Sequence, residues 1–371
     1  MTAHVVHILS SFGMGGQERV AFDLAVSQLR AGWRVAALSL APPPDGPLAA
    51  EFHAAGIAVD RVARPRPGVD PVLVLRLARW LRTHRVDLVH THNRMALIYG
   101  APAGRLAGAR VVHTKHGNNP KGGTRLFAGK LSARLVDAFV AVSAETAEFA
   151  RKRNEIDERR LMVIANGIEL GRFHPEPAAR ARVRNELGIA GDAWVIGTVG
   201  RIATEKNQAL LLRAMAPLLG PKVRLIVAGD GPLLPALSEL AGTLGVTQLT
   251  HLLGARRDVP DVLNALDVFV MSSDTEGLPL VVLEAMATSL PVVSTSVGGI
   301  PNVLEEGQTG FLVPAGDEAA LRHRVEKLYS DPAASRACGA RARSAAVTRF
   351  SAERMQRDYL ELYTRVLSVN P

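Results

Sequence analysis

The stretch DTEGLPLVVLEAMA, residues 274–287, places two glutamates, Glu276 and Glu284, either side of a Gly-Leu-Pro turn and an apolar run. Its apolar run predicts a buried helix that begins at Pro279, because proline suits the first helical position. Glu284 would lie inside that helix, where a carboxylate needs hydrogen-bond donors. Ribose hydroxyls would supply them, and a core Arg or backbone amide is the alternative. Glu276 precedes the helix. The unpaired N–H groups at the helix N-terminus suit a phosphate, so the segment could form a phosphate-binding site with a hydroxyl-binding carboxylate on each side.

Arg201 and Lys206 lie in GRIATEKN, residues 200–207, directly after a predicted strand. Ligands in open α/β sheets bind outside the carboxyl ends of the strands. Two cations at this edge could neutralise a diphosphate leaving group as it gains charge, with Arg as a bidentate fork and Lys as a point charge. A solvated pair of loop residues is the alternative.

The glycine loop SSFGMGGQERV, residues 10–20, follows the first predicted strand. It does not match the dinucleotide fingerprint G-x-G-x-x-G, because position 18 is Glu. The end of the second strand reads Ser39, Leu40 and Ala41, without the acidic residue that such a site requires. The loop therefore argues against a nicotinamide cofactor, although its glycines still allow a ligand to approach the backbone closely.

His116 enters a Gly-Asn loop at the end of the predicted strand in VVHTKHGNN, residues 111–119. Three further histidines make a zinc site an alternative to a structural role, namely His90, His92 and His113. Their spacing does not match an H-x-x-x-H or H-E-x-x-H helix, and Cys338 is the only cysteine. There is also no D-x-D element, which a cation-dependent sugar-nucleotide site would be expected to show, so we expect no metal.

Residues 121–139 combine cations with apolar side chains at helical spacing. This pattern resembles an interfacial helix on an anionic membrane, and a solvated helix face is the alternative. The cations are Lys121, Arg125, Lys130 and Arg134, and the apolar residues are Leu126, Phe127, Leu131 and Leu135.

The composition indicates a globular chain with anionic partners. Its 371 residues suggest two domains, and 47% hydrophobic with 21% charged residues permits a substantial core. The net charge of +9 favours an anionic lipid surface or a phosphorylated small molecule. Nucleic acid is disfavoured because aromatic residues make up only 5% and no recognition motif is found. A single cysteine, no membrane-length apolar run and no signal peptide favour a reducing cytoplasm.

Short β-branched runs alternate with helical patterns along the whole chain, which is typical of doubly wound parallel sheets. In the first half, strands are predicted at 5–9, 34–40, 57–62, 87–92, 109–116, 138–143 and 161–166, and helices at 17–30 and 71–84. In the second half, strands are predicted at 194–200, 223–229, 249–254, 267–272, 291–295 and 310–313, followed by a tail that is helical from Pro332 to Leu367.

A Pro- and Arg-rich break separates the halves. We therefore expect an N-terminal Rossmann-like domain over residues 1–170, a linker at 171–192, a second Rossmann-like domain over 193–350 and a terminal helix at 351–371. Two such domains would serve one cleft.

These motifs together resemble the retaining glycosyltransferases of family 4, which have the GT-B architecture. The resemblance covers nearly the whole chain. It rests on the glycine loop, TKHG around His116, NGIELGRF, GRIATEKN, VAGDGP at 227–232, the Glu276/Glu284 pair and VVSTSVGGIPNVLEEGQTGFLV at 292–313. One departure is Asn302, where the family usually has Glu after VGGIP.

The resemblance implies a role for each motif. The second half would bind a nucleotide sugar: Arg201 and Lys206 at the diphosphate, Glu284 at the ribose, and Glu276 with the amides of Gly277 and Leu278 at the transferred sugar. His116 would reach the sugar and help place the acceptor, and the terminal helix would return to the first domain. The remaining donor-binding residues would be Gly16, Gly231, Leu253, Pro279 and Leu280.

We therefore expect a retaining, metal-independent transferase that moves a hexosyl group from a UDP- or GDP-sugar to an acceptor hydroxyl. A lipid-linked or exopolysaccharide acceptor would fit the basic helix, and with it peripheral contact with the inner face of the plasma membrane. The alternatives are a GT-B sugar-nucleotide epimerase, a nicotinamide dehydrogenase and a non-catalytic module that binds sugar or lipid.

Overall fold

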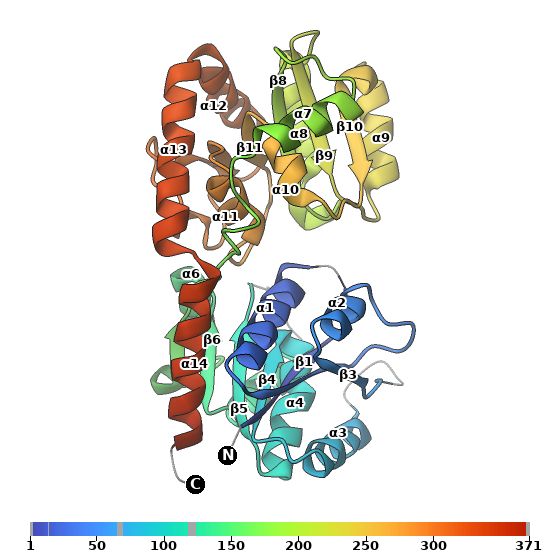
Figure 1. Cartoon of the computed structure of the whole chain (residues 1–371), viewed down its shortest axis with the longest axis vertical. Coiled ribbons are helices and arrows are strands. Elements are labelled where there is room, and N and C mark those ends of the chain that lie inside the picture. The colour runs from blue at the N-terminus through green and yellow to red at the C-terminus, as the bar shows by residue number, and fades with distance from the viewer. Residues whose placement is uncertain (1–2, 14, 65–69, 118–123, 369–371) are drawn as a thin grey trace. The chain divides into compact units, whose positions relative to one another are not determined.

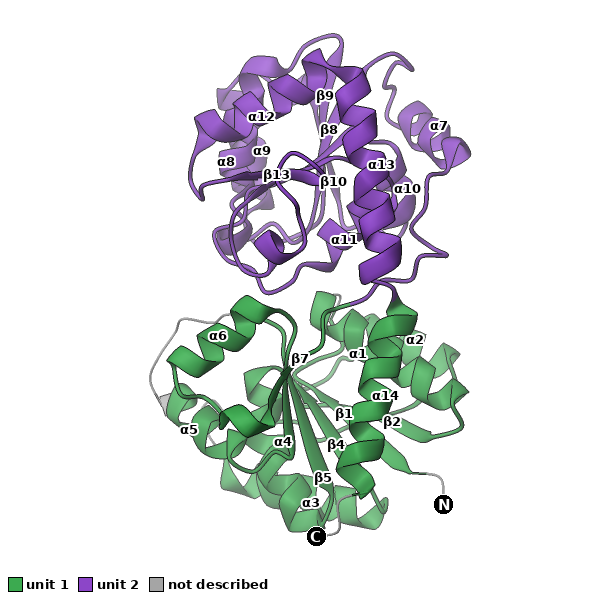
Figure 2. Ribbon diagram, turned by 90° about the vertical axis from the view of Figure 1, so that its left-hand side faces the viewer, with its two compact units in different colours: residues 1–166, 352–371 green, residues 167–351 purple. Residues whose placement is uncertain are grey.

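Strand β1 (His4–Leu9) is followed by helix α1 (Gly16–Arg30), and the same alternation continues along the chain, as the sequence predicts (Figure 1). The computed structural model describes residues 3–13, 15–64, 70–117 and 124–368. The chain divides into unit 1, residues 1–166 with 352–371, and unit 2, residues 167–351 (Figure 2). Each unit contains one parallel sheet with helices on both faces, which confirms the predicted fold class.

The sheet of unit 1 has the strand order β3-β2-β1-β4-β5-β6-β7. Its central strands are buried on both faces, as in other parallel sheets that helices cover on both sides. The strand order reverses between β1 and β4, which is where ligands bind in open sheets of this kind. The other strands are β2 (Arg34–Ser39), β3 (Ala58–Arg61), β4 (Leu88–His92), β5 (Arg110–Lys115), β6 (Ala138–Ala141) and β7 (Leu161–Val163).

Helix α4 covers one face of this sheet, and α1 and α14 pack together on the other. Two glycines of α4 lie against the sheet, where a Cβ on Gly100 would meet Thr91 at 2.5 Å and one on Gly104 would meet Val111 at 2.8 Å. Helix α3 buries Leu73, Leu77 and Leu81 at four-residue spacing, so one apolar stripe faces the core. The helices besides α1 are α2 (Leu48–Ala54), α3 (Pro71–Thr83), α4 (Asn93–Ala107), α5 (Thr124–Ala133), α6 (Ala144–Lys152) and α14 (Ala352–Ser368).

Unit 2 repeats the arrangement with the strand order β10-β9-β8-β11-β12-β13, which reverses between β8 and β11. The strands are β8 (Trp194–Val199), β9 (Val223–Ala228), β10 (Thr250–Gly254), β11 (Val268–Met271), β12 (Val292–Thr295) and β13 (Gly310–Val313). The helices are α7 (Pro177–Glu186), α8 (Gln208–Met215), α9 (Leu234–Thr243), α10 (Val259–Asn264), α11 (Leu280–Ala287), α12 (Glu318–Ser330) and α13 (Pro332–Arg349).

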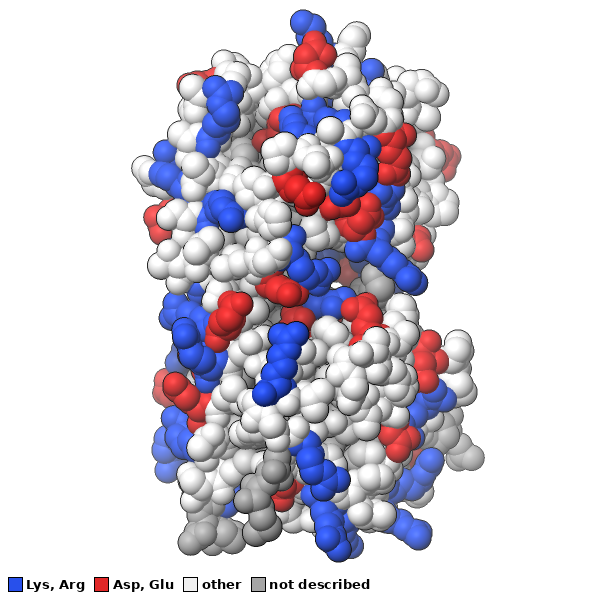
Figure 3. Space-filling model, viewed as in Figure 1, with Lys and Arg blue, Asp and Glu red and all other residues white. Residues whose placement is uncertain are grey.

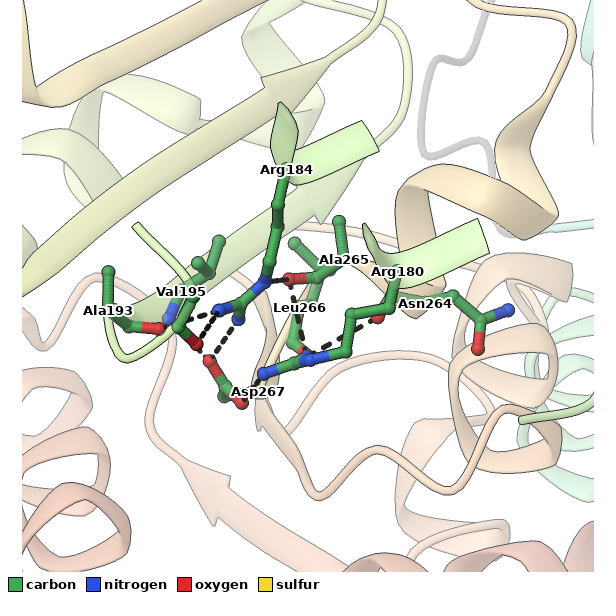
Figure 4. Close-up of polar contacts among 9 residues, drawn as sticks. Arg180, Arg184, Ala193, Val195, Asn264, Ala265, Leu266 and Asp267 are labelled. Carbon is green, nitrogen blue, oxygen red and sulfur yellow. Dashed lines mark hydrogen bonds and ion pairs between the residues drawn. The ribbon is translucent and has the colours of Figure 1, made fainter. Parts of the chain in front are cut away.

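Residues 171–192, expected to be a linker, instead contribute helix α7 to unit 2. Figure 4 shows two arginines of this helix, Arg180 and Arg184, in polar contact with Asp267. Arg184 is almost fully buried and donates to Asp267 Oδ2 at 2.7 Å and to the carbonyls of Ala193 at 2.8 Å and Ala265 at 2.9 Å. Arg180 donates to Asp267 Oδ1 at 2.7 Å. The arginines that gave this segment a linker-like composition therefore anchor α7 to the sheet.

The tail is helical but not continuous, because α13 ends at Arg349 and α14 begins at Ala352. The break separates the two units, since α13 belongs to unit 2 and α14 to unit 1. Among the described residues, none of the helices combines the length and apolar character that a membrane span requires. On the face in Figure 3, Lys and Arg are interspersed with Asp and Glu, so the net positive charge is not gathered in one patch there.

Candidate functional site

The loop after β8 presents the predicted cation Arg201. Backbone bonds hold this loop against the one after β9, where the Ile202 N–H donates to the Asp230 carbonyl at 2.9 Å. A Cβ on Gly231 would lie 2.2 Å from the Ile202 carbonyl oxygen, so this approach requires glycine. Arg201 is exposed, and its guanidinium makes no hydrogen bond or ion pair with another described residue. Its charge is therefore available to a ligand.

Lys206 and Glu276 contact each other at the carboxyl ends of β8 and β11. Lys206 Nζ lies 2.5 Å from Glu276 Oε1, and the Ser273 hydroxyl donates to the same oxygen at 2.7 Å. The Glu276 side chain is 9% exposed and that of Lys206 is 24% exposed. Since strand order reverses between β8 and β11, the structure brings two residues predicted from separate motifs to the place where such sheets bind ligands.

The loop after β11 is held by backbone contacts on two sides. On one side, the Asp274 N–H donates to the Glu205 carbonyl at 2.9 Å. On the other, the Gly299 N–H donates to the Gly277 carbonyl at 2.5 Å, and a Cβ on Gly298 would lie 2.4 Å from the Glu276 carbonyl oxygen. Gly298 also has φ +60°, which favours glycine. The position of the Glu276 carboxylate is therefore fixed by its backbone as well as by Lys206.

Helix α11 begins one residue later than the sequence predicts. Pro279 is extended and precedes the first helical residue, Leu280. The backbone before it, including Gly277 and Leu278, is buried. Glu284 is the fifth residue of α11 and is half-buried, so a contact between its carboxylate and ribose hydroxyls stays a prediction.

Leu253, predicted as a donor-binding residue, lies half-buried on β10, and the loop that follows it contains Arg256. Arg256 in this loop is occupied, because it pairs with Glu186 at 2.5 Å and Asp258 at 2.6 Å. These two carboxylates raise the pKa of Arg256 above its usual value. The Arg256 side chain therefore already has two carboxylate partners within unit 2.

In unit 1, Gly16 is the exposed first residue of α1, so the glycine loop leads directly into a helix N-terminus. Burial raises the pKa of the nearby Glu18 carboxyl. Glu18 packs against the loop, since its Oε2 occupies the place that a Cβ on Gly15 would take. The residue that breaks the dinucleotide fingerprint is therefore a packing residue of the loop.

His116 follows β5, is half-buried, and forms the end of a row of otherwise buried side chains. His116 Nε2 lies 3.0 Å from His92 Nδ1, and His92 Nε2 lies 2.9 Å from His7 Nδ1. His7 Nε2 in turn lies 2.9 Å from Gln28 Oε1. Burial lowers the pKa of His7 to about 4 and that of His116 to about 3, so these rings are neutral near pH 7. The fourth predicted histidine, His113, faces away from this row and bonds Thr91 at 2.9 Å.

His7, His90 and His92 lie close enough together to hold a metal ion. Each of their ring nitrogens, however, already has a hydrogen-bond partner; His90 binds Thr114 at 2.7 Å and Tyr363 at 2.6 Å. An ion would have to break these bonds and displace the row. The donor set therefore fits a hydrogen-bond network better than a metal centre.

Helix α5 presents part of the predicted basic and apolar face. Phe127 is 72% exposed and Leu131 is 54% exposed, one turn apart. Arg125 in α5 and Arg134 just after its end are also exposed, whereas Lys121 lies outside the described residues. Of the predicted 121–139 segment, only Thr124–Ala133 forms this helix. Membrane contact through this face stays a prediction.

Sequence reasoning missed His7 and Gln28 as parts of the site. The only local signal was the pair His90 and His92, whose spacing places both on one face of a strand. Linking them to His7 required the pairing of β1 with β4, which brings His7 opposite His90.

Two family profiles match the chain. "Glycosyltransferase Family 4" matches residues 14–172, and "Glycosyl transferases group 1" matches residues 179–345. The chain is 31% identical to the UDP-Gal:alpha-D-GlcNAc-diphosphoundecaprenol alpha-1,3-galactosyltransferase of Escherichia coli, over 71% of each chain. It is 32% identical to the alpha-maltose-1-phosphate synthase of Mycolicibacterium smegmatis, over 82% of this chain and 87% of that one.

Solved structures show the same fold. Anabaena Alr3699/HepE in complex with UDP-glucose superposes with a TM-score of 0.88, at 24% identity, over 98% of this chain and 99% of that one. WaaG, a glycosyltransferase involved in lipopolysaccharide biosynthesis, superposes with a TM-score of 0.78, at 19% identity, over 95% and 98%. The predicted family, fold and enzyme class are thus confirmed: the chain belongs to the family 4 glycosyltransferases and has the GT-B fold.

Proposed function

We propose that this glycosyltransferase moves a hexosyl group from a UDP- or GDP-sugar to an acceptor hydroxyl, with retention at the anomeric carbon and without a metal ion. The observation that carries the proposal is the contact between Lys206 and Glu276 at 2.5 Å. It joins a cation suited to a diphosphate and a carboxylate suited to sugar hydroxyls at the strand-order reversal of unit 2.

Relatives use donors of this class. The E. coli relative is named for UDP-galactose, and a relative in M. smegmatis, 31% identical over 73% of this chain, is named as a GDP-mannose-dependent mannosyltransferase. The name of the first also describes a diphosphoundecaprenol acceptor. A lipid-linked acceptor and an anionic membrane surface at α5 are therefore part of the proposal.

The proposed chemistry is a front-face substitution. The bond between the anomeric carbon and the diphosphate oxygen breaks, and its electron pair leaves with the diphosphate. The acceptor oxygen forms the new bond on the same face and gives its proton to the departing phosphate. Lys206 and Arg201 stabilise the charge that develops on that phosphate, and Glu276 orients the hexose through its hydroxyls.

A panel of UDP- and GDP-hexoses tests the proposal. One donor should raise the unfolding temperature of the purified protein and, with an acceptor, should yield a glycoside and the free nucleotide diphosphate. The product should have the anomeric configuration of the donor by NMR, and added EDTA should leave the rate unchanged. An inverted product or loss of activity in EDTA would contradict the retaining or the metal-independent part.

A time course with the nucleotide sugar but no acceptor distinguishes a transferase from a sugar-nucleotide epimerase. Conversion of the nucleotide sugar to an isomer or a free sugar as the main reaction would favour that alternative over transfer. Protection by NADH but not by UDP or GDP would favour a dehydrogenase. Sugar binding without turnover of any donor would favour a non-catalytic module.

A further inference from the structure

Four side chains in unit 1 form one hydrogen-bonded row: the buried Gln28, His7 and His92, and the half-buried His116. We propose that this row fixes the tautomer of His116, so that its Nδ1 is an unprotonated acceptor for a ligand hydroxyl. Gln28, His7 and His92 are then positioning residues for His116. The identity of that hydroxyl as a sugar hydroxyl rests on the proposed function, whereas the tautomer does not.

The row follows from strand register. His7 pairs with His90 across β1 and β4, and His92 lies two residues further along the same face. His92 pairs with Thr114 across β4 and β5, and His116 lies two residues beyond Thr114. Each step therefore moves one strand across and two residues towards the carboxyl edge of the sheet. Helix α1 supplies Gln28 at the buried end.

The orientation of the Gln28 amide determines which nitrogen of each histidine in the row donates its hydrogen bond and which accepts. A neutral imidazole has one N–H, so it donates through one nitrogen and accepts through the other. Because the Gln28 carbonyl oxygen accepts from His7 Nε2, His7 Nδ1 must accept from His92 Nε2. His92 Nδ1 must then accept from His116 Nε2, which leaves the lone pair of His116 on Nδ1.

The free end of the row calls for a donor. His116 Nδ1 is shielded from solvent and has no hydrogen-bond partner among the described residues. A buried acceptor without a partner destabilises the folded protein, and a hydroxyl that donates to it removes that penalty. A carboxylate or phosphate oxygen has no proton to offer near pH 7. The free atom therefore favours a ligand group that can donate a proton, such as a sugar hydroxyl, over a carboxylate or phosphate oxygen.

A second hydrogen-bond network lies beside the row and supplies a residue for a control variant, Thr114. Tyr363 binds His90 at 2.6 Å, His90 binds Thr114 at 2.7 Å, and Thr114 binds Tyr359 at 2.9 Å. Tyr363 also interacts with the Gln28 side chain, whose Nε2 is buried and makes no hydrogen bond with a described residue. If the Gln28 amide were reversed, every donor in the row would reverse and His116 Nδ1 would carry the proton. The two orientations thus make opposite predictions for one atom.

Nitrogen NMR of the full chain with ¹⁵N-labelled histidine distinguishes them. The ligand-free protein should show an unprotonated Nδ1 and a protonated Nε2 for His116, assigned by the resonance that disappears in His116→Asn. A proton on Nδ1 would overturn the proposal. Because no ligand is present, this result does not depend on whether the proposed function is correct.

Three variants test the role of Gln28. Gln28→Met removes the polar end, so both tautomers of His116 should appear; with half the molecules in each form, kcat/KM should fall about twofold. Gln28→Glu keeps an acceptor and should restore one tautomer and the lost activity. Thr114→Val, equally buried but in the second network, should lower stability and leave the tautomer unchanged. An unchanged tautomer in Gln28→Met, or a mixed one in Thr114→Val, would overturn the proposal.

Ligand titrations test the hydroxyl. A UDP-hexose that the enzyme turns over should shift the His116 Nδ1 resonance, and UDP alone should not. Turnover without that shift would overturn the contact and leave the proposed function standing. Failure of every nucleotide sugar to bind would overturn the proposed function and the sugar contact together, while the tautomer result would stand by itself.

Discussion

Lys206→Met separates the structural from the chemical role of the contact with Glu276. The substitution leaves the Glu276 carboxylate, 9% exposed, with the Ser273 hydroxyl as its remaining partner of the two described above. Removing one partner of a fully buried ion pair costs about 3–5 kcal/mol. Lys206 is 24% exposed, so water can replace part of the lost interaction, and we expect a loss of about 2 kcal/mol in the free energy of unfolding. Urea denaturation measures it.

The expected effect of Lys206→Met on turnover is larger. Loss of one group that stabilises developing charge in a transition state typically lowers kcat by about 10²–10³, or roughly 3–4 kcal/mol. The assay is release of the nucleotide diphosphate at saturating donor, at a temperature where the variant remains folded. A kcat within a few-fold of wild type would remove Lys206 from the proposed mechanism.

The double variant Lys206→Met with Glu276→Gln completes the test. Neutral side chains at both positions leave no unpaired charge, so stability should return to within about 1 kcal/mol of wild type. Turnover should stay at least as low as in Lys206→Met, because neither the cation nor the carboxylate is restored. Recovery of turnover together with stability would show that the pair is structural and would refute this reasoning.

Four further predictions concern the rest of the molecule. Arg184→Met should lower the free energy of unfolding by about 3 kcal/mol in urea, because it leaves Asp267 without one of its buried partners, whereas Arg182→Met at the exposed pair with Asp261 should stay close to wild type. Gly298→Ala should abolish most turnover, because the added Cβ would collide with the Glu276 carbonyl. Gly316→Ala is the control: Gly316 has φ +81° but no atom within 4 Å of an added Cβ, so this variant should lose only about 1 kcal/mol of stability and stay active. Burial lowers the pKa of His7 from 6.5 to about 4, so between these pH values the unfolded chain binds more protons than the folded one. The free energy of unfolding should therefore decrease as the pH is lowered from 6.5 towards 4. His7→Phe should reduce the dependence of the free energy of unfolding on pH in this range by about 1.4 kcal/mol per pH unit. Phe127→Glu should weaken co-sedimentation with anionic vesicles and Leu106→Glu, an exposed apolar position on α4, should not; equal binding by both variants would place the membrane surface elsewhere.

The alternation of elements could be predicted because each strand of a doubly wound sheet is a short apolar run between helical patterns. Predicted and observed strands agree closely, as in the run at 310–313, which is β13. The segment 171–192 was assigned to a linker because it is rich in Pro, Arg and Gly and has no strand pattern, whereas it contributes helix α7 to unit 2. Arg184 is buried by an ion pair with Asp267, a partner more than eighty residues away that local composition does not reveal.

The terminal helix expected at 351–371 begins close to the observed start of α14 at Ala352, but the tail was also expected to be helical without interruption, and its local pattern does not show the break. Residues from Pro332 onward have helical propensity on both sides of Phe350, so nothing in the periodicity ends the helix there. Phe350 is buried, and its carbonyl accepts from the Ile168 N–H at 2.9 Å. A tertiary contact thus decides where one helix stops and the next begins.

Part of the candidate site could likewise be predicted from the sequence, and part could not. Lys206 and Glu276 were found separately, each from a motif whose residues are close in sequence, and the strand order then brought them together. The histidine row offers no such motif, because its members come from two strands, the loop after a third strand and one helix. A row of this kind can be recognised only after the strand pairing and its register are known. A shift of one residue in the register of β1 or β4 would turn His7 or His92 to the opposite face of the sheet. It follows that the register of β1, β4 and β5 is itself part of the site: a change that slips one of these strands would disconnect Gln28 from His116 while leaving every side chain of the row in the sequence.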